Sequence, residues 1–96
     1  MMPEQPQFPA LREFLRGYFH EDLEDEYGSP HAAAEQFWED ADDGQRKAAA
    51  AEWVKFLKET KTLNLDQVNQ RLRELGSAWA FGNLAELHKI SAVFRT

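Results

Sequence analysis

The spacing of apolar residues constrains the fold of this chain more than any other feature. Apolar residues recur at the spacing of an α-helix over almost the whole sequence. One set recurs at i, i+3, i+4 and i+7 and comprises Leu11, Phe14, Leu15 and Tyr18. This spacing places side chains on one face of an α-helix, whereas a half-buried strand would alternate at every second residue. With a proline at its start, the pattern predicts a helix over about residues 9–19.

Start and stop signals divide the remaining chain into four more helices. Ser29 followed by Pro30 is typical of a helix start, because the serine side chain caps free N–H groups and proline fits the first helical position. The fourth helix starts at either Asn64 or Asp66 and stops at Gly76, a residue type that suits the position after a helix. The five expected helices cover about residues 9–19, 29–41, 45–61, 64–76 and 83–94.

These elements predict an all-α fold, a single small domain of about five helices packed as a compact bundle. A chain of 96 residues forms one domain, and its hydrophobic fraction of 43% is sufficient for a packed core. We expect residues 1–7 to form a flexible N-terminal tail and residues 8–96 to form the helical domain. The expected core comprises Leu11, Phe14, Leu15, Tyr18, Phe37, Trp53, Val54, Leu57, Leu72 and Leu87.

The composition favours a cytoplasmic protein. The chain has no Cys, which excludes disulfides and thiolate metal sites and suits a reducing compartment. Residues 1–10 lack the basic and apolar regions of a signal peptide, and no run approaches the ~18 apolar residues of a membrane span. We therefore expect no membrane association.

The negative charge is concentrated in one segment, which contains ten carboxylates and no Lys or Arg. These are Glu21, Asp22, Glu24, Asp25, Glu26, Glu35, Glu39, Asp40, Asp42 and Asp43. The remaining residues carry seven acids and all eleven bases, so the rest of the chain is mildly positive. Nucleic-acid binding is disfavoured at this segment, and a basic protein partner is favoured.

The densest part of this segment, residues 21–26, has three interpretations. It is a solvated loop that aids solubility, a recognition surface for a basic partner, or a metal site. A calcium loop of the EF-hand type needs acids at alternate positions, a central Gly and a Glu at position twelve. Residues 22–28 lack that spacing, so we expect neither a metal nor another cofactor.

No arrangement of residues indicates catalysis. The three histidines, His20, His31 and His88, form none of the paired motifs that bind zinc. His20 could act as a general base held by Asp22 or Glu21, but such a residue more often caps the end of a helix. We expect His20 to be a structural support, and we expect Gly17 to let its helix bend or approach a neighbour.

The expected partner-binding surface combines the unneutralised acids with two aromatic residues. Trp79 and Phe81 lie between helices, outside the helical periodicity, so each either packs in the core or is partly exposed. We include both in the partner surface because Trp contributes much of the energy at interfaces. Mutual repulsion among the acids is relieved when a cationic surface binds. The full set is Asp22, Glu24, Asp25, Glu26, Glu39, Asp40, Asp42, Asp43, Trp79 and Phe81.

The run from Phe8 to Asp22, FPALREFLRGYFHED, resembles the opening of a family of bacterial contact-dependent growth inhibition immunity proteins. The likeness extends over residues 8–42 and includes the helix start at Ser29-Pro30. Glu21 replaces the usual Gln, and Leu23 stands where an aromatic residue is common. The resemblance implies a cytoplasmic all-α protein, not an enzyme, that neutralises the C-terminal toxin domain of a large exported effector.

A nuclease toxin needs a basic cleft to bind phosphates, so an acidic inhibitor surface fits the implied partner. Two alternatives remain open. One is a small helical adaptor whose acidic face binds another protein. The other is a metallohydrolase that uses carboxylates and a histidine.

Overall fold

Helix boundaries in the computed structural model, which describes residues 8–94, follow the capping signals of the sequence. Its six helices are α1 (Pro9–Tyr18), α2 (Leu23–Tyr27), α3 (Pro30–Asp40), α4 (Asp43–Glu59), α5 (Leu65–Glu74) and α6 (Leu84–Val93). Among these residues there is no strand, which confirms the all-α prediction. The Cα radius of gyration of 12.8 Å is that expected of one compact domain. The tail expected at residues 1–7 lies outside the described residues.

Side-chain caps fix the starts of α3 and α5 as expected. The Ala32 N–H donates to Ser29 Oγ over 3.1 Å. Asn64, rather than Asp66, caps α5, because its side chain accepts from the Gln67 N–H at 2.9 Å while the Gln67 side chain accepts from the Asn64 N–H at 3.0 Å. This reciprocal arrangement satisfies two donors that the helix leaves free.

α4 begins earlier than expected, because Asp43 and Gly44 are part of the helix and not of the connection that precedes it. Asp42 Oδ1 accepts from the Gln45 N–H at 2.8 Å, and Gln45 Oε1 accepts from the Asp42 N–H at 2.9 Å. Asp42 is therefore the N-cap, and Asp43 and Gly44 belong to the first turn. The capping box starts α4 two residues earlier than predicted.

The acidic residues expected in a loop form a short helix, α2, instead. Leu23, its first residue, is fully buried and anchors it to the core. Glu24, Asp25 and Glu26 occupy its first turn, where negative charge meets the positive end of the helix dipole. Gly28, with a φ of 90° that suits glycine, ends the helix. An anchored helix holds these carboxylates in defined positions, which a solvated loop would not.

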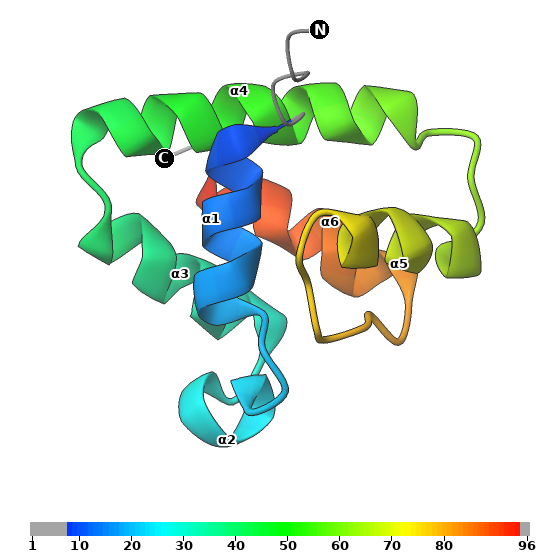
Figure 1. Ribbon diagram of the computed structural model, residues 1–96, viewed down its shortest axis with the longest axis horizontal. Coiled ribbons are helices and arrows are strands. Elements are labelled where there is room, and N and C mark those ends of the chain that lie inside the picture. Colours follow the sequence, from blue (N-terminus) through cyan, green and yellow to red (C-terminus); the bar gives the residue numbers. More distant parts are fainter. Residues whose placement is uncertain (1–7, 95–96) are drawn as a thin grey trace, which may run out of the picture.

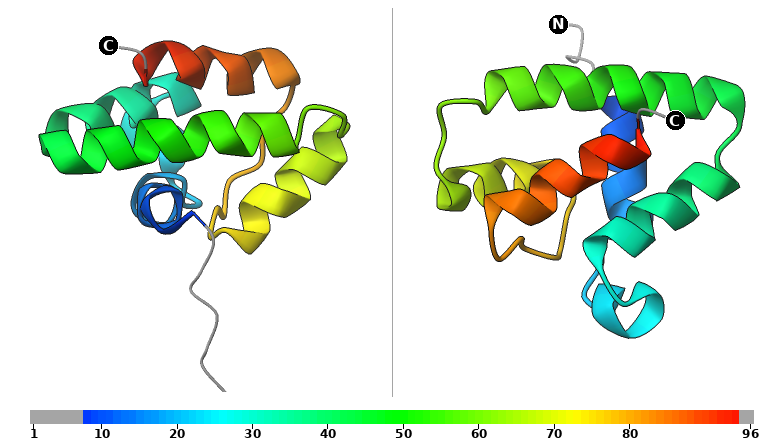
Figure 2. Two further views of the ribbon diagram at one scale, coloured as in Figure 1. Left: turned by 90° about the horizontal axis from the view of Figure 1, so that it is seen from above. Right: turned by 180° about the vertical axis from the view of Figure 1, so that it is seen from behind.

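A group of aromatic rings forms the centre of the core, where α1, α3 and α6 meet. The Phe14 ring lies 4.7 Å from that of Phe37, 5.1 Å from Phe19 and 5.5 Å from Phe94, measured between centroids. Figures 1 and 2 show α1 crossing between α3 and α4, with α6 behind it. α4 is joined to this core through Trp53, whose ring lies 5.6 Å from Phe94.

Seven of the ten predicted core residues are buried, and Tyr18 and Leu57 are partly buried. Val54 is an error in the prediction, because its side chain is 53% exposed. α4 has apolar residues on a wide face, and Trp53 and Phe56 occupy the part that packs inward. Val54 is displaced by about 100° around the helix from Trp53, the rotation per residue of an α-helix, and points to solvent.

Glu52 of α4 caps the start of α1 from outside that helix. Its carboxylate accepts from the backbone N–H groups of Ala10, at 3.2 Å, and Leu11, at 3.0 Å. These are among the donors that the first turn of a helix leaves without a partner. The negative charge of Glu52 also interacts favourably with the positive end of the α1 dipole. This contact therefore fixes α1 against α4.

None of the helices within residues 8–94 is long and apolar enough to cross a membrane.

Candidate functional site

Eight of the predicted partner-binding residues form a region that we call the acidic end. It comprises Asp22, Glu24, Asp25, Glu26, Glu39, Asp40, Asp42 and Asp43, all of which are exposed. They lie at α2, at the last two residues of α3 and at the start of α4. Figures 1 and 2 place α2 and the junction between α3 and α4 on the side of the molecule away from α5.

Four of these carboxylates have partners within the protein. Asp40 has the strongest set, because Tyr18 Oη donates to its Oδ2 at 2.6 Å and Gln36 Nε2 donates to its Oδ1 at 3.0 Å. Asp42 caps α4, as described above. Glu26 lies 2.8 Å from His20 Nε2, whereas the side chain of Asp43, 93% exposed, lies 3.8 Å from Arg46. Except for that of Asp43, these partners hold the carboxylates in place, so their removal would disturb the fold as well as the surface.

The other four carboxylates have no such role. The side chains of Asp22, Glu24, Asp25 and Glu39 make no hydrogen bond or ion pair with any part of residues 8–94. Their charges are therefore held on ordered helices, or directly beside one, and no side chain of residues 8–94 neutralises them. Such groups interact with a cationic partner without first giving up an internal partner.

Two tyrosines, which the sequence did not assign to the site, connect the parts of the acidic end. The ring of Tyr18 stacks on Tyr27 at 5.7 Å, while its hydroxyl binds Asp40. Burial and the Asp40 carboxylate raise the pKa of Tyr18 well above its usual value, and burial and the charges of Glu26 and Asp40 raise that of Tyr27. Both phenols are uncharged at neutral pH, and that of Tyr18 donates to Asp40. Tyr18 was assigned to the core because it continues the apolar stripe of α1.

His20 supports α2 with both ring nitrogens. Its Nδ1 accepts from the Asp22 N–H at 3.2 Å, its Nε2 lies 2.8 Å from a Glu26 oxygen, and its ring lies 6.0 Å from Tyr27. This geometry matches the structural role expected of His20. No group of three or more His, Asp or Glu within residues 8–94 is arranged to hold a metal ion.

Gly17 does not make the close approach that is one of the two roles expected from the sequence. A Cβ built at this position would meet no atom within 4 Å, and the residue is exposed. Neither a close helix approach nor a crowded neighbour therefore requires glycine here. The expectation of a close contact at Gly17 is wrong.

The two aromatic residues expected near the site differ in exposure. Phe81 is only 3% exposed, so its expected availability to a partner is wrong. Asn69 fixes it by donating from Nδ2 to the Phe81 carbonyl at 2.9 Å and accepting the Phe81 N–H at 2.8 Å. Trp79 is partly buried, with its ring packed edge-on against Phe19 and Phe81. Of the two, Trp79 is the one with surface left to contact a partner.

A family model described as CdiI immunity protein matches residues 7–82, which include the whole acidic end and helices α1 to α5. No curated protein and no solved structure matches the chain.

Proposed function

Because the chain belongs to the CdiI immunity protein family, we propose that it binds and neutralises the C-terminal toxin domain of a contact-dependent growth inhibition effector. Membership of an immunity family implies an inhibitor rather than an enzyme, and a toxin protein as its partner. We place this activity in the cytoplasm, where a delivered toxin meets its target.

We propose the acidic end as the surface that contacts the toxin. The observation that carries this proposal is the set of four exposed carboxylates, at Asp22, Glu24, Asp25 and Glu39, that have no neutralising partner within residues 8–94. Self-repulsion among such groups lowers the stability of the free protein, and a cationic surface relieves it on binding. Exposed carboxylates of this kind favour a partner with a basic surface.

A toxin that cleaves nucleic acid provides a basic surface, because its cleft must bind phosphates. Opposite charges on the two proteins would steer their encounter and raise the association rate toward about 10⁸–10⁹ M⁻¹s⁻¹ at low salt. An inhibitor that must leave almost no free toxin needs nanomolar or tighter binding, about −12 kcal/mol or stronger. Charge alone does not supply this energy, so apolar contacts are also needed.

We propose two aromatic residues for those contacts. Tyr27 lies beside the carboxylates, and Trp79 packs on Phe19 at the end of α1. Both are half-buried against the core, so their rings are already held in place before the toxin binds. Ordered aromatic side chains lose little conformational freedom on binding and are frequent at the centres of interfaces.

The function can be tested by producing this chain with the C-terminal toxin domain encoded next to it in the genome. We expect growth to be restored, the two purified proteins to form a complex, and toxin activity to fall in proportion to the chain added. The toxin domain with an unrelated acidic helical protein serves as the control. Unimpeded toxin activity with this chain in excess would refute the proposal and favour the adaptor hypothesis.

A further inference from the structure

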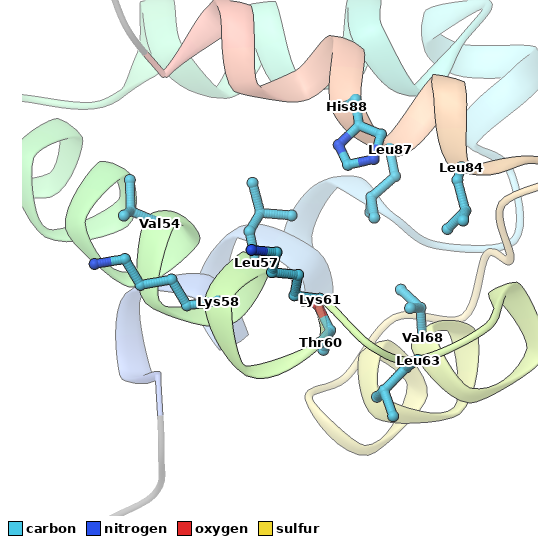
Figure 3. A pocket seen from close by; sticks show the side chains of 10 residues that line it. All are labelled: Val54, Leu57, Lys58, Thr60, Lys61, Leu63, Val68, Leu84, Leu87 and His88. Carbon is cyan, nitrogen blue, oxygen red and sulfur yellow. The ribbon is translucent and has the colours of Figure 1, made fainter.

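A second region lies where the C-terminal half of α4, α5 and the beginning of α6 meet, and we call it the apolar pocket. Its volume is about 480 Å³, within the range of pockets that bind ligands. It is lined by Val54, Leu57, Lys58, Thr60, Lys61, Leu63, Val68, Leu84, Leu87 and His88. Figure 3 shows these side chains coming from three sides of one space.

The pocket holds large apolar side chains that are exposed to solvent. Within residues 8–94, Val54 and Leu84 are the large hydrophobic residues that reach solvent, at 53% and 37% exposure, and both line the pocket. Scattered exposed apolar residues are common, but their convergence on one concave surface is typical of a binding site.

The charges around the pocket oppose those of the acidic end. Two lysines, Lys58 and Lys61, line it together with His88, and no carboxylate belongs to the lining. Neither lysine forms an ion pair within residues 8–94. In a protein with a net charge of −6, this is a local excess of positive charge beside an apolar floor.

We propose that the apolar pocket binds an amphipathic segment of a protein partner, in which apolar side chains are flanked by carboxylates. An amphipathic helix places two or three apolar side chains into such a groove at helical spacing. The flanking carboxylates then meet the two lysines. This site goes beyond the proposed function and is separate from the acidic end, so it does not depend on which partner that end binds.

Residues 8–94 of a second copy do not supply such a segment. Two facing pockets would bring lysines against lysines, which repel each other. The acidic end of another copy has the right charge, but it exposes no large aliphatic or Phe side chain within residues 8–94 that could enter the pocket. We therefore assign the pocket to a different protein, and the oligomeric state of the chain tests this choice.

Two synthetic helical peptides test the proposal. Both carry Leu at i, i+3, i+4 and i+7, and one has Glu and the other Lys at the flanking positions. We expect the Glu peptide to bind the full chain at least about tenfold more tightly, a difference of about 1.4 kcal/mol. Backbone amide chemical shifts should change around residues 54–63 and 84–88. Equal affinities, no binding by either peptide, or changes confined to other residues would overturn the proposal.

Matched variants locate the binding. Val54→Asp should weaken Glu-peptide binding about tenfold, because it places a charge on the apolar floor. Ala85→Asp, exposed next to Leu84 but outside the lining, should leave it unchanged. The double variant Lys58→Glu/Lys61→Glu should reverse the preference, so that the Lys peptide binds more tightly.

Circular dichroism confirms that each variant is folded. Equal binding by Val54→Asp and Ala85→Asp would overturn the proposal. A dimer of the unmodified chain in sedimentation that dissociates on Val54→Asp would also overturn it, since it would make a second copy the occupant.

Discussion

The acidic end and the apolar pocket differ in how they are encoded. The acidic end comes from one continuous stretch, residues 22–43, and its charge is visible in the order of residues. The pocket combines α4 and α5 with the start of α6, so it exists only once these helices pack. Charge is therefore a local property of this chain, whereas the shape of its surface depends on contacts between distant segments.

The acidic end and the apolar pocket also favour partners of opposite charge. The acidic end has four carboxylates without partners among residues 8–94 and is suited to a basic surface. The apolar pocket has two lysines that form no ion pair with the described part of the chain, and it is suited to an apolar segment with acidic flanks. A single domain can thus contact two different partners. Mutations in the acidic end should leave binding at the apolar pocket unchanged, and mutations in the pocket should leave binding at the acidic end unchanged.

The largest expected effect is a difference in the free energy of unfolding between variants of two adjacent residues of α4. Trp53 lies in the core and Val54 at the pocket. Trp53→Ala should destabilise the protein by about 3–5 kcal/mol, because it removes a fully buried ring that contacts Phe56 and Phe94. Val54→Ala should change stability by less than about 0.5 kcal/mol, because the side chain is mostly exposed. Urea denaturation measures both. Similar losses would show that Val54 is buried and that the pocket has no open apolar floor.

A smaller effect concerns the hydrogen bond that holds the acidic end together. Tyr18→Phe should lower stability by about 1 kcal/mol at neutral pH, because Asp40 loses the hydroxyl donor and keeps Gln36. Chemical denaturation of the two proteins gives the difference. An unchanged stability would mean that the hydroxyl does not support the acidic end.

The same variant has a predicted pH signature. Because the folded pKa of Tyr18 is raised, its contribution is fully present below the unfolded value of about 10 and is lost as pH rises toward the folded value. The unmodified protein should therefore lose stability above about pH 10, and Tyr18→Phe should lose less. Parallel losses in the two proteins would contradict the assignment.

The smallest effect is expected at Gly17, near the end of α1. Gly17→Ala should stabilise the protein by about 0.5–1 kcal/mol, since alanine favours the helix and nothing lies within 4 Å of the added carbon. Thermal denaturation at neutral pH tests this. A destabilised variant would show that glycine is needed at this position after all.

The sequence predicted the features that depend on near neighbours. Ser29 and Asn64 cap helices because their side chains reach N–H groups three residues further on. The exposure of the acids followed from the cost of burying charge. The short helix α2 was missed, because its order depends on the burial of a single leucine, Leu23, against the core.

Features that depend on distant neighbours could not be predicted in this way. Phe81 is buried because Asn69, twelve residues away, satisfies both of its backbone polar groups. Val54 is exposed because the neighbouring helices do not cover the whole apolar side of α4. Periodicity shows that a residue lies on an apolar face, but only the packing shows how much of that face is covered.

The central claim, that the acidic end contacts the toxin, can be tested with a charge-neutralised variant that keeps the fold. Glu24→Gln, Asp25→Asn and Glu39→Gln are combined, because these side chains have no partner among the residues that the structure describes. Glu26, Asp40 and Asp42 are left unchanged because they support the structure.

The matched control neutralises Glu13, Glu59 and Asp66, which are exposed and lie outside the acidic end. Both triple variants carry the same net charge, so they differ only in where charge is removed.

The decisive measurement is the rate of association with the cognate toxin domain across a series of salt concentrations. The acidic-end variant should associate about tenfold more slowly at low salt and show a flatter dependence on salt, because steering by opposite charges is lost. The control should stay close to the unmodified protein. Equal changes in the two variants, or no change in the acidic-end variant, would contradict the claim that the toxin binds at the acidic end.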